Sequence, residues 1–361
     1  MEKIYVTRPL LPDFDEFMKL SKEIFESKHL TNMGPKHNLL EEKLKGVLDV
    51  SNVSLFNNGT IALIVALKAL DLPLGSEVIT TPFTFSATPH SIMWCGLKPV
   101  FCDVEKDLMT IDTSKIEALI TPKTSAILGV HVYGFPCNVE KIEKIAKKHN
   151  LKVIYDAAHA FCSEIDNKGI GNFGDITMFS FHATKLFNSV EGGALTYNDP
   201  NLASKIYSLR NFGIKNESQV EYVGINGKMN EFCAAFGLLN LEKFQKERLL
   251  RKKIKEFYDS KISQIKGIRI PKMPSNVQNS YQYYPIIIED EYELSRDELY
   301  EKFKQNDIFT RKYFYPACVD YDCYEKTGSF DVLDDIKNRV LCLPYYGELT
   351  EDDLNRIVGV F

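Results

Sequence analysis

Seven short apolar runs, separated by stretches of helical periodicity, are the feature that most restricts how this chain can fold. They cover residues 53–56, 77–81, 99–103, 126–133, 152–156, 176–181 and 193–197. Strands that are buried on both faces have continuous apolar sequences, and their alternation with helices is typical of a mostly parallel sheet covered by helices. The first two thirds of the chain are therefore predicted to form an α/β domain.

A long helical stretch, from about residue 228 to 263, connects this region to the rest of the chain. Lys, Glu and Arg become frequent after Leu241, as on a solvated helix face. The last hundred residues contain an apolar run at 281–288 and helical stretches at 295–306 and near Thr350. We expect a large domain of residues 1–245 and a smaller α+β domain of residues 246–361.

The charge balance argues against a nucleic-acid-binding protein. The 44 Lys and Arg residues are outnumbered by 49 Asp and Glu residues, which gives a net charge of −5. A chain without a basic excess has little with which to neutralise a phosphate backbone. A small anionic ligand is still compatible with this charge, because a helix N-terminus can bind a phosphate without net positive charge.

The cysteines and the apolar stretches indicate the cellular compartment of the protein. The eight cysteines are scattered without a CxxC pair, so we predict no metal site and expect free thiols in a reducing cytosol. The longest apolar stretch, residues 61–67, is too short to span a bilayer, and charges near the N-terminus do not fit a signal peptide. We expect a soluble cytoplasmic protein that has no membrane partner.

Two charged residues follow predicted strands at the edge where open α/β sheets bind ligands. Asp156 ends the run 152–156, and its carboxylate either caps a following helix or pairs with a protonated ring nitrogen. Lys185 has unusually apolar neighbours for a lysine. It is either a solvated surface residue or a buried amine, whose lowered pKa would make it a nucleophile toward carbonyls. Together the two residues suggest a Schiff-base site.

Residues 58–60, Asn-Gly-Thr, are predicted to open a helix directly after a strand. The segment is either a simple turn with a threonine cap or a phosphate site, because backbone N–H groups and the positive end of the helix dipole point to one place there. Hydroxyl groups of Ser180 and Thr184 are within reach of the same phosphate. Phe85 is either a core residue or a ring that stacks on a planar cofactor.

In combination these motifs resemble the DegT/DnrJ/EryC1/StrS group of sugar aminotransferases, which are pyridoxal-phosphate enzymes of the aspartate aminotransferase fold (fold type I). The resemblance runs from Pro9 to the C-terminus. It implies a mixed, mostly parallel seven-stranded sheet and a smaller α+β C-terminal domain. The matching segments are 58–60, 80–88, 155–159, 174–175, 179–185, 191–193, 224–231, 310–316 and 342–344.

The resemblance also implies a role for each residue of the site. Lys185 would bind pyridoxal 5′-phosphate covalently and act as the catalytic base and acid, while Asp156 would keep the pyridine nitrogen protonated. His159, at a position where the family often has Gln, would contact the ring hydroxyl and add pH sensitivity. The other cofactor contacts would come from Gly59, Thr60, Phe85 and Ser180, with Asn226 supplied by the second subunit of a homodimer with shared active sites.

The implied reaction moves an amino group from L-glutamate, which leaves as 2-oxoglutarate, to C-4 of a nucleotide-linked 4-keto-6-deoxy sugar. The segments 181–185 and 191–193 resemble those of members that act at C-4. The implied substrate is dTDP-4-keto-6-deoxyglucose, and the product dTDP-4-amino-4,6-dideoxyglucose would serve a surface polysaccharide such as the O-antigen of lipopolysaccharide. The alternatives are amination of a 3-keto sugar, another pyridoxal-phosphate-dependent sugar modification, or a non-catalytic regulatory member.

Three further residues are predicted to contact the substrate: Arg311, Tyr313 and His182. Arg311 either pairs through its planar guanidinium with a diphosphate or a donor carboxylate, or forms an interdomain salt bridge. His182 either contacts the substrate or packs under the cofactor loop. Lys215 and Lys228 are additional basic residues expected near the site.

Overall fold

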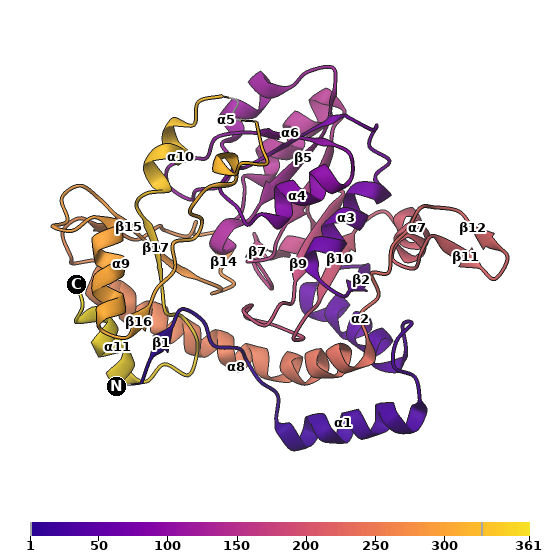
Figure 1. The fold of residues 1–361 in the computed structure, drawn as a ribbon, viewed down its shortest axis with the longest axis horizontal. Coiled ribbons are helices and arrows are strands. Elements are labelled where there is room, and N and C mark those ends of the chain that lie inside the picture. The colour runs from indigo at the N-terminus through magenta and orange to yellow at the C-terminus, as the bar shows by residue number, and fades with distance from the viewer. Residues whose placement is uncertain (1, 326–327) are drawn as a thin grey trace.

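The structure is a computed structural model that describes residues 2–325 and 328–361 (Figure 1). A seven-stranded sheet lies at its centre, with the strand order β2-β10-β9-β6-β5-β3-β4. Strand β10 runs antiparallel to both neighbours, and the other pairings are parallel. The strands are β2 (Val53–Phe56), β3 (Glu77–Thr80), β4 (Lys98–Phe101), β5 (Thr124–Val130), β6 (Lys152–Asp156), β9 (Ile176–Ser180) and β10 (Gly193–Tyr197). The predicted mixed, mostly parallel sheet is thus confirmed.

The predicted run 126–133 is too long at its C-terminal end. Strand β5 stops at Val130, and the chain then turns through a short 3₁₀ helix, Val132–Gly134. Tyr133 has a φ of 55°, a left-handed conformation in which a β-strand cannot continue. This turn takes the chain out of the sheet beside the carboxyl end of β6.

Helices cover both faces of the sheet, and alternate strand residues point to opposite cores. Leu128 and Met178 face a core shared with α3 (Gly59–Ala69), α4 (Ala87–Trp94) and α7 (Asn201–Leu209). Their neighbours Ile127 and Phe179 face the other side. That side is covered by α2 (Pro35–Leu48), α6 (Val139–His149) and part of α8 (Glu231–Ile262).

Helix α8 extends along one side of the molecule and contacts α1 (Phe14–Ser27), α2 and α11 (Figure 1). Its Phe244 packs in the core with α2, and its Tyr258 packs in the C-terminal core. The predicted domain boundary at residue 245 therefore falls inside this helix. The C-terminal elements are β13 (Ile268–Arg269), β15 (Tyr284–Ile288), α9 (Arg296–Gln305), α10 (Asp331–Ile336), β17 (Val340–Leu343) and α11 (Glu351–Val358).

Short elements complete the described chain. The hairpin of β11 and β12 projects from the body of the molecule (Figure 1). The remaining elements are β1 (Ile4–Tyr5), α5 (Thr113–Ile116), β7 (Glu164–Ile165), β8 (Lys168–Gly169), β11 (Ile214–Asn216), β12 (Gln219–Val220), β14 (Val277–Gln278) and β16 (Ile308–Phe309), with 3₁₀ turns at Glu117–Leu119, Ile170–Asn172 and Cys318–Asp320.

Local capping explains why the predicted helices begin where they do. The Asn138 side chain accepts a hydrogen bond from the backbone of α6, and Ser295 forms a capping box at the start of α9. All eight cysteines are free, and six of them are buried, as predicted. Within the described part of the chain, no helix is long and apolar enough to cross a membrane.

Candidate active site

A cavity of about 670 Å³ opens at the carboxyl ends of β6 and β9, beside the N-terminus of α3. Its lining includes every residue predicted above for the cofactor and the substrate, with the exception of Asn226. Segments that are far apart in the sequence meet there because parallel strands end at the same edge of the sheet.

Lys185 lies five residues after β9, in a segment without regular secondary structure. Its side chain lines the cavity and is otherwise surrounded by protein. Its Nζ lies 5.8 Å from the ring centroid of Tyr283. Burial lowers the pKa of its amine to about 8, although the nearby Asp156 carboxylate opposes this shift. A substantial part of the amine is therefore neutral, and nucleophilic, close to physiological pH.

Asp156 is the last residue of β6, and its side chain is buried. The Thr88 hydroxyl donates a hydrogen bond to Oδ2 at 2.7 Å, and the Ala158 N–H donates to Oδ1 at 3.0 Å. Burial raises the pKa of the carboxyl, whereas these two bonds and Lys185 lower it. No helix follows Asp156, since residues 157–160 form a turn, so the carboxylate stabilises that turn while it lines the cavity.

His159 is buried, and its Nδ1 accepts a hydrogen bond from the backbone N–H of Tyr133 at 3.1 Å. The proton of the neutral ring must therefore be on Nε2. Burial, and to a smaller extent Lys185, lowers the pKa of His159 well below its ordinary value. This direction favours the neutral ring and argues against the expectation that His159 adds pH sensitivity.

The start of α3 provides a site for an anion. The Asn58 side chain accepts a hydrogen bond from Ile61 N–H at 2.8 Å, so Asn58 caps the helix rather than the threonine considered above. A Cβ atom on Gly59 would lie 3.2 Å from Met178 Sδ and from Ser180 Cβ. The absence of a side chain thus allows this turn to pack closely against β9, where N–H groups of the first helical turn have no partner within the helix.

Phe85 is not a core residue. It lines the cavity, and its side chain is 61% exposed. An aromatic ring in this position is available to cover one face of a planar ligand.

Arg311, Tyr313 and His182 lie in the same cavity lining as Glu191. The Arg311 guanidinium is 5.4 Å from the Tyr313 ring centroid. Within residues 2–325 and 328–361 it forms no ion pair, so the interdomain salt bridge is not found. His182 is exposed, with Nε2 3.6 Å from Glu191 Oε1, and therefore does not pack beneath a loop.

Three predicted residues lie outside this cavity lining. Asn226 is exposed, and its backbone oxygen accepts a hydrogen bond from the Asn57 side chain at 3.3 Å. Lys228 donates to Asn211 Oδ1 at 2.8 Å, and Lys215 pairs with Glu221. The two lysines are thus engaged elsewhere in their own chain.

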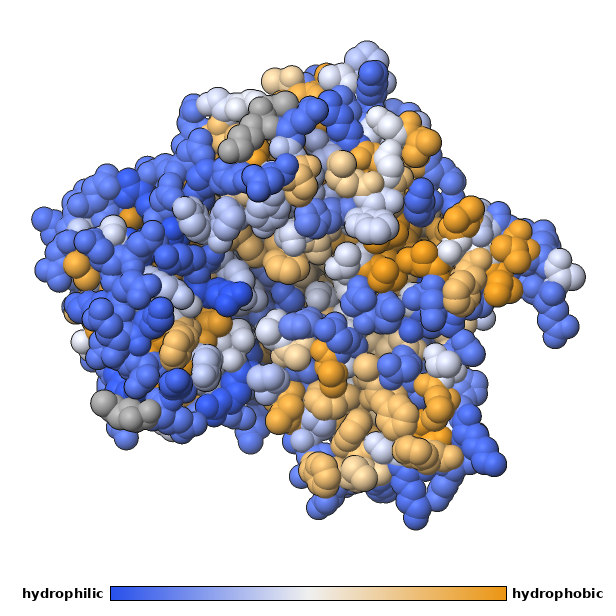
Figure 2. Space-filling view, viewed as in Figure 1, coloured by the Kyte–Doolittle hydropathy of each residue, from blue (hydrophilic) through white to orange (hydrophobic). Residues whose placement is uncertain are grey.

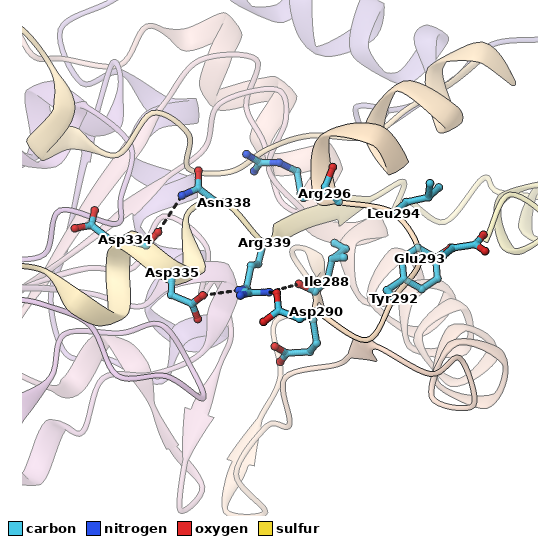
Figure 3. A pocket seen from close by; sticks show the side chains of 12 residues that line it. Ile288, Asp290, Tyr292, Glu293, Leu294, Arg296, Asp334, Asp335, Asn338 and Arg339 are labelled. Atoms are coloured by element: carbon cyan, nitrogen blue, oxygen red, sulfur yellow. Dashed lines mark hydrogen bonds and ion pairs between the residues drawn. The ribbon is translucent and has the colours of Figure 1, made fainter.

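A second hollow, of about 450 Å³, lies between the loop after β15 and α10 (Figure 3). Arg339 sits in it between Asp290 and Asp335, at 2.7 and 2.5 Å. The Arg339 guanidinium is thus already paired within the hollow, and none of the predicted site residues lines it. The chemistry is concentrated in the first cavity.

No role was predicted for Thr88 or Tyr283, although both shape the site. The Thr88 hydroxyl lies 2.9 Å from that of Thr84 and donates to Asp156. Tyr283 packs edge to face on His159, with ring centroids 4.9 Å apart. Thr84 lies before α4, so no helical spacing indicates the threonine contact, and nothing in the aromatic run around Tyr283 indicates which ring faces the cavity.

Comparison with known proteins identifies the family. The model of the DegT/DnrJ/EryC1/StrS aminotransferase family matches residues 13–361. The chain belongs to this family. It is therefore an aminotransferase, and the resemblance on which the sequence-based prediction relied is confirmed.

Two curated relatives of this aminotransferase carry the name dTDP-4-amino-4,6-dideoxy-D-glucose transaminase. The one from Shigella dysenteriae is 46% identical, covering 99% of this chain and 98% of the relative. The one from Escherichia coli is 45% identical, covering 98% and 96%. Among solved structures, that of DesI in the presence of its TDP-sugar product superposes with a TM-score of 0.95 at 32% identity, over 100% of this chain and 92% of DesI. The predicted fold is thereby confirmed.

Aminotransferases of this family depend on pyridoxal phosphate, and the cavity fits that group. It offers an amine of lowered pKa for the aldehyde and a buried carboxylate for the ring nitrogen. It also has the exposed Phe85 ring for a planar face and the Gly59 turn for the phosphate. Each chemical feature of the cofactor thus has a complementary group in this chain.

Proposed function

We propose that this aminotransferase moves the amino group of L-glutamate to C-4 of dTDP-4-keto-6-deoxyglucose, which yields dTDP-4-amino-4,6-dideoxyglucose. The observation that carries the proposal is Lys185, an amine with a pKa of about 8 in the same cavity as a buried carboxylate. Two relatives named as dTDP-4-amino-4,6-dideoxy-D-glucose transaminases, at 46% and 45% identity over nearly the whole chain, support the choice of substrate.

Lys185 is the group that moves protons. Pyridoxal phosphate, when bound, supplies an electron sink for the negative charge that develops on the reacting carbon. The neutral amine of Lys185 takes the proton from Cα of L-glutamate, and in the second half of the reaction its ammonium form returns a proton to C-4 of the sugar. A pKa near the working pH suits both tasks, because each form of the amine is then populated.

The other residues hold and polarise the cofactor. Asp156 would place a negative charge beside the protonated pyridine nitrogen. His159, whose Nδ1 is occupied by the Tyr133 N–H, would donate from Nε2 to the ring oxygen. Phe85 would cover one ring face. The proposed phosphate contacts are Gly59, Thr60 and Ser180.

Arg311, Tyr313 and His182 are the proposed substrate contacts at the mouth of the cavity. The guanidinium of Arg311 has no carboxylate partner among the described residues, so it is available for a diphosphate or for the donor carboxylate. The pair of His182 and Glu191 comes from the two segments that favoured C-4. The resemblance of both segments to those of members that act at C-4 supports amination at C-4 over C-3.

We also propose a homodimer with shared active sites. Asn226 is exposed and lies outside the cavity of its own chain, as expected if it serves a second subunit. Apolar side chains gather on the surface over α1 (Figure 2), where Leu11, Phe14 and Phe25 are more than 60% exposed. An apolar area of this kind on a helix is typical of a subunit interface.

Three further assignments accompany this proposal. We propose that residues 1–245 bind the cofactor and that residues 246–361 close the cavity from the other side. The reaction would take place in the cytoplasm, in agreement with free, mostly buried thiols. Its product is a nucleotide-activated amino sugar, the form from which a surface polysaccharide such as an O-antigen is assembled.

A product assay tests the proposal. The purified holoenzyme is incubated with L-glutamate and, in parallel, with dTDP-, UDP- and GDP-linked 4-keto-6-deoxy sugars, and the aminated carbon is identified by NMR. We expect nitrogen at C-4 and the highest kcat/KM with the dTDP sugar. Nitrogen at a carbon other than C-4, or a preference for another nucleotide, would overturn the substrate assignment.

A further inference from the structure

We propose that Gln282 is a positioning residue that fixes the backbone on both sides of Lys185. The inference builds on the function proposed above, because it concerns how the reacting amine is held. It goes beyond that function because Gln282 lies outside the cavity lining and touches neither predicted ligand.

The side chain of Gln282 bridges the two peptide groups that flank Lys185. Its Oε1 accepts a hydrogen bond from Leu186 N–H at 2.6 Å, and its Nε2 donates to the Thr184 carbonyl at 3.2 Å. Only one orientation of the amide satisfies both bonds, because a peptide N–H always donates and a peptide carbonyl always accepts. The amide therefore fits this segment in a single way.

The segment needs such a partner because residues 181–192 form neither helix nor strand. Buried peptide groups outside regular secondary structure must find hydrogen bonds elsewhere. Lys185 N–H donates to the His182 carbonyl at 2.8 Å. Leu186 is fully buried and Gln282 is 2% exposed, so water is poorly placed to replace the amide.

Gln282 itself belongs to a strap, residues 279–283, that α8 anchors. Arg248 donates to the Asn279 carbonyl at 2.7 Å, and Arg251 donates to the Gln282 carbonyl at 3.3 Å. Both arginines are buried. The strap thus connects the rigid helix α8 directly to the lysine segment.

The same strap also holds His159. The Ser280 hydroxyl donates to the His159 carbonyl at 2.7 Å and accepts from Gln282 N–H at 3.3 Å. Lys185 and His159 are consequently fixed to one short piece of chain. When the Lys185 side chain moves during the two halves of the reaction, its backbone stays in place, and the amine returns to the same position relative to Asp156.

The test uses two variants and a matched control. Gln282→Leu removes both hydrogen bonds at similar volume. Gln282→Glu keeps an acceptor for Leu186 N–H, but its ionised carboxylate cannot donate to Thr184. Gln278→Leu is the control, since Gln278 is an exposed glutamine four residues away that bonds only to Glu164 among the described side chains.

Two quantities are measured for each full-length protein. The first is kcat and KM with L-glutamate for the holoenzyme. The second is the pH midpoint at which Lys185 reacts with acetic anhydride in the cofactor-free protein, followed by peptide mass spectrometry. We expect kcat of Gln282→Leu to fall about 10- to 100-fold, with KM changed less than about threefold, because a displaced amine slows the chemistry more than binding.

We further expect the Lys185 midpoint of Gln282→Leu to rise from about 8 toward 10.5, since a loosened segment admits water. Gln282→Glu should be intermediate, and the control should match the wild type. A folded Gln282→Leu with unchanged kcat and midpoint overturns the inference, even if its melting temperature is lower. Should that variant not fold, unchanged values in Gln282→Glu overturn it instead. If the wild type forms no 2-oxoglutarate, the proposed function fails, while the midpoint still tests Gln282.

Discussion

At the scale of single residues, Lys185 and Asp156 determine the electrostatics of the cavity. Burial moves each pKa toward the neutral form, downward for the amine and upward for the carboxyl. Their mutual attraction opposes both shifts. The pair therefore keeps the lysine pKa at about 8, low enough for a neutral amine and high enough for an acid.

Asp156→Asn tests this balance. Because the Asp156 charge raises the pKa of Lys185, its removal should move the acylation midpoint of cofactor-free Lys185 below about 8. We also expect kcat to fall about 100-fold or more, because the charge that stabilises the cofactor is lost. Asp112→Asn, at the cap of α5, is the control and should keep both values. A midpoint that rises in Asp156→Asn would contradict the account.

His159→Gln tests the neutral state of the histidine. Since burial lowers the pKa of His159 well below its ordinary value, we expect no titration step of this ring at the ordinary pKa of a histidine. The variant should therefore show a pH profile of kcat with the same shape as that of the wild type, whatever its absolute rate. The disappearance of a titration step near pH 6.5 in the variant would show that His159 does change its charge.

At the scale of secondary structure elements, the N-terminus of α3 is the most sensitive point. In Gly59→Ala the new Cβ would lie 3.2 Å from Met178 and Ser180, which would push the helix start away from β9. We expect the Kd for pyridoxal phosphate to rise about 10-fold, because the N–H groups no longer converge on the phosphate. Equilibrium dialysis measures this change.

Gly46→Ala is the matched control for that substitution. Gly46 lies within α2, and a Cβ there would meet no atom within 4 Å. Alanine should stabilise the helix by about 1 kcal/mol and leave the Kd unchanged. If both variants lose affinity to the same extent, the close contact at Gly59 is not the cause.

The central sheet could be predicted because each of its strands is a continuous run of apolar residues in the sequence. All seven apolar runs became strands, since burial on both faces imposes a continuous apolar sequence. The sequence is less informative where contacts between distant segments decide where a strand begins or ends. Only residues 284–288 of the apolar run 281–288 form strand β15, because Arg248 and Arg251 of α8 bind the carbonyls of Asn279 and Gln282 and hold this stretch as a strap.

The sequence indicated which residues line the cavity, but not the hydrogen bonds that fix their protonation and position. Most of its residues lie in short contiguous motifs at strand ends, where topology brings them together. The tautomer of His159 depends on the Tyr133 N–H, 26 residues away. The bridge from Gln282 to the Lys185 segment spans 96 residues. No local sequence pattern indicates either of these two contacts.

At the scale of the whole molecule, the proposed sharing of sites can be tested with hybrid dimers. Lys185→Ala and Asn226→Ala chains are each expected to be nearly inactive alone. If Asn226 serves the partner's cavity, every mixed dimer contains one site with both residues intact. Co-expression should then restore roughly a quarter of the wild-type activity, because about half of the dimers are mixed. No recovery, with dimers present by analytical ultracentrifugation, would place Asn226 in its own chain's site or in none.

The most direct test of the central claim is the reaction with L-glutamate alone. The quantity measured is the 2-oxoglutarate released per chain when stoichiometric holoenzyme meets L-glutamate without any sugar. We expect about one equivalent from the wild type, since the first half of a ping-pong reaction proceeds without the second substrate, and almost none from Lys185→Ala. A wild type that releases no 2-oxoglutarate, or a folded Lys185→Ala variant that releases it at the wild-type rate, would contradict the account.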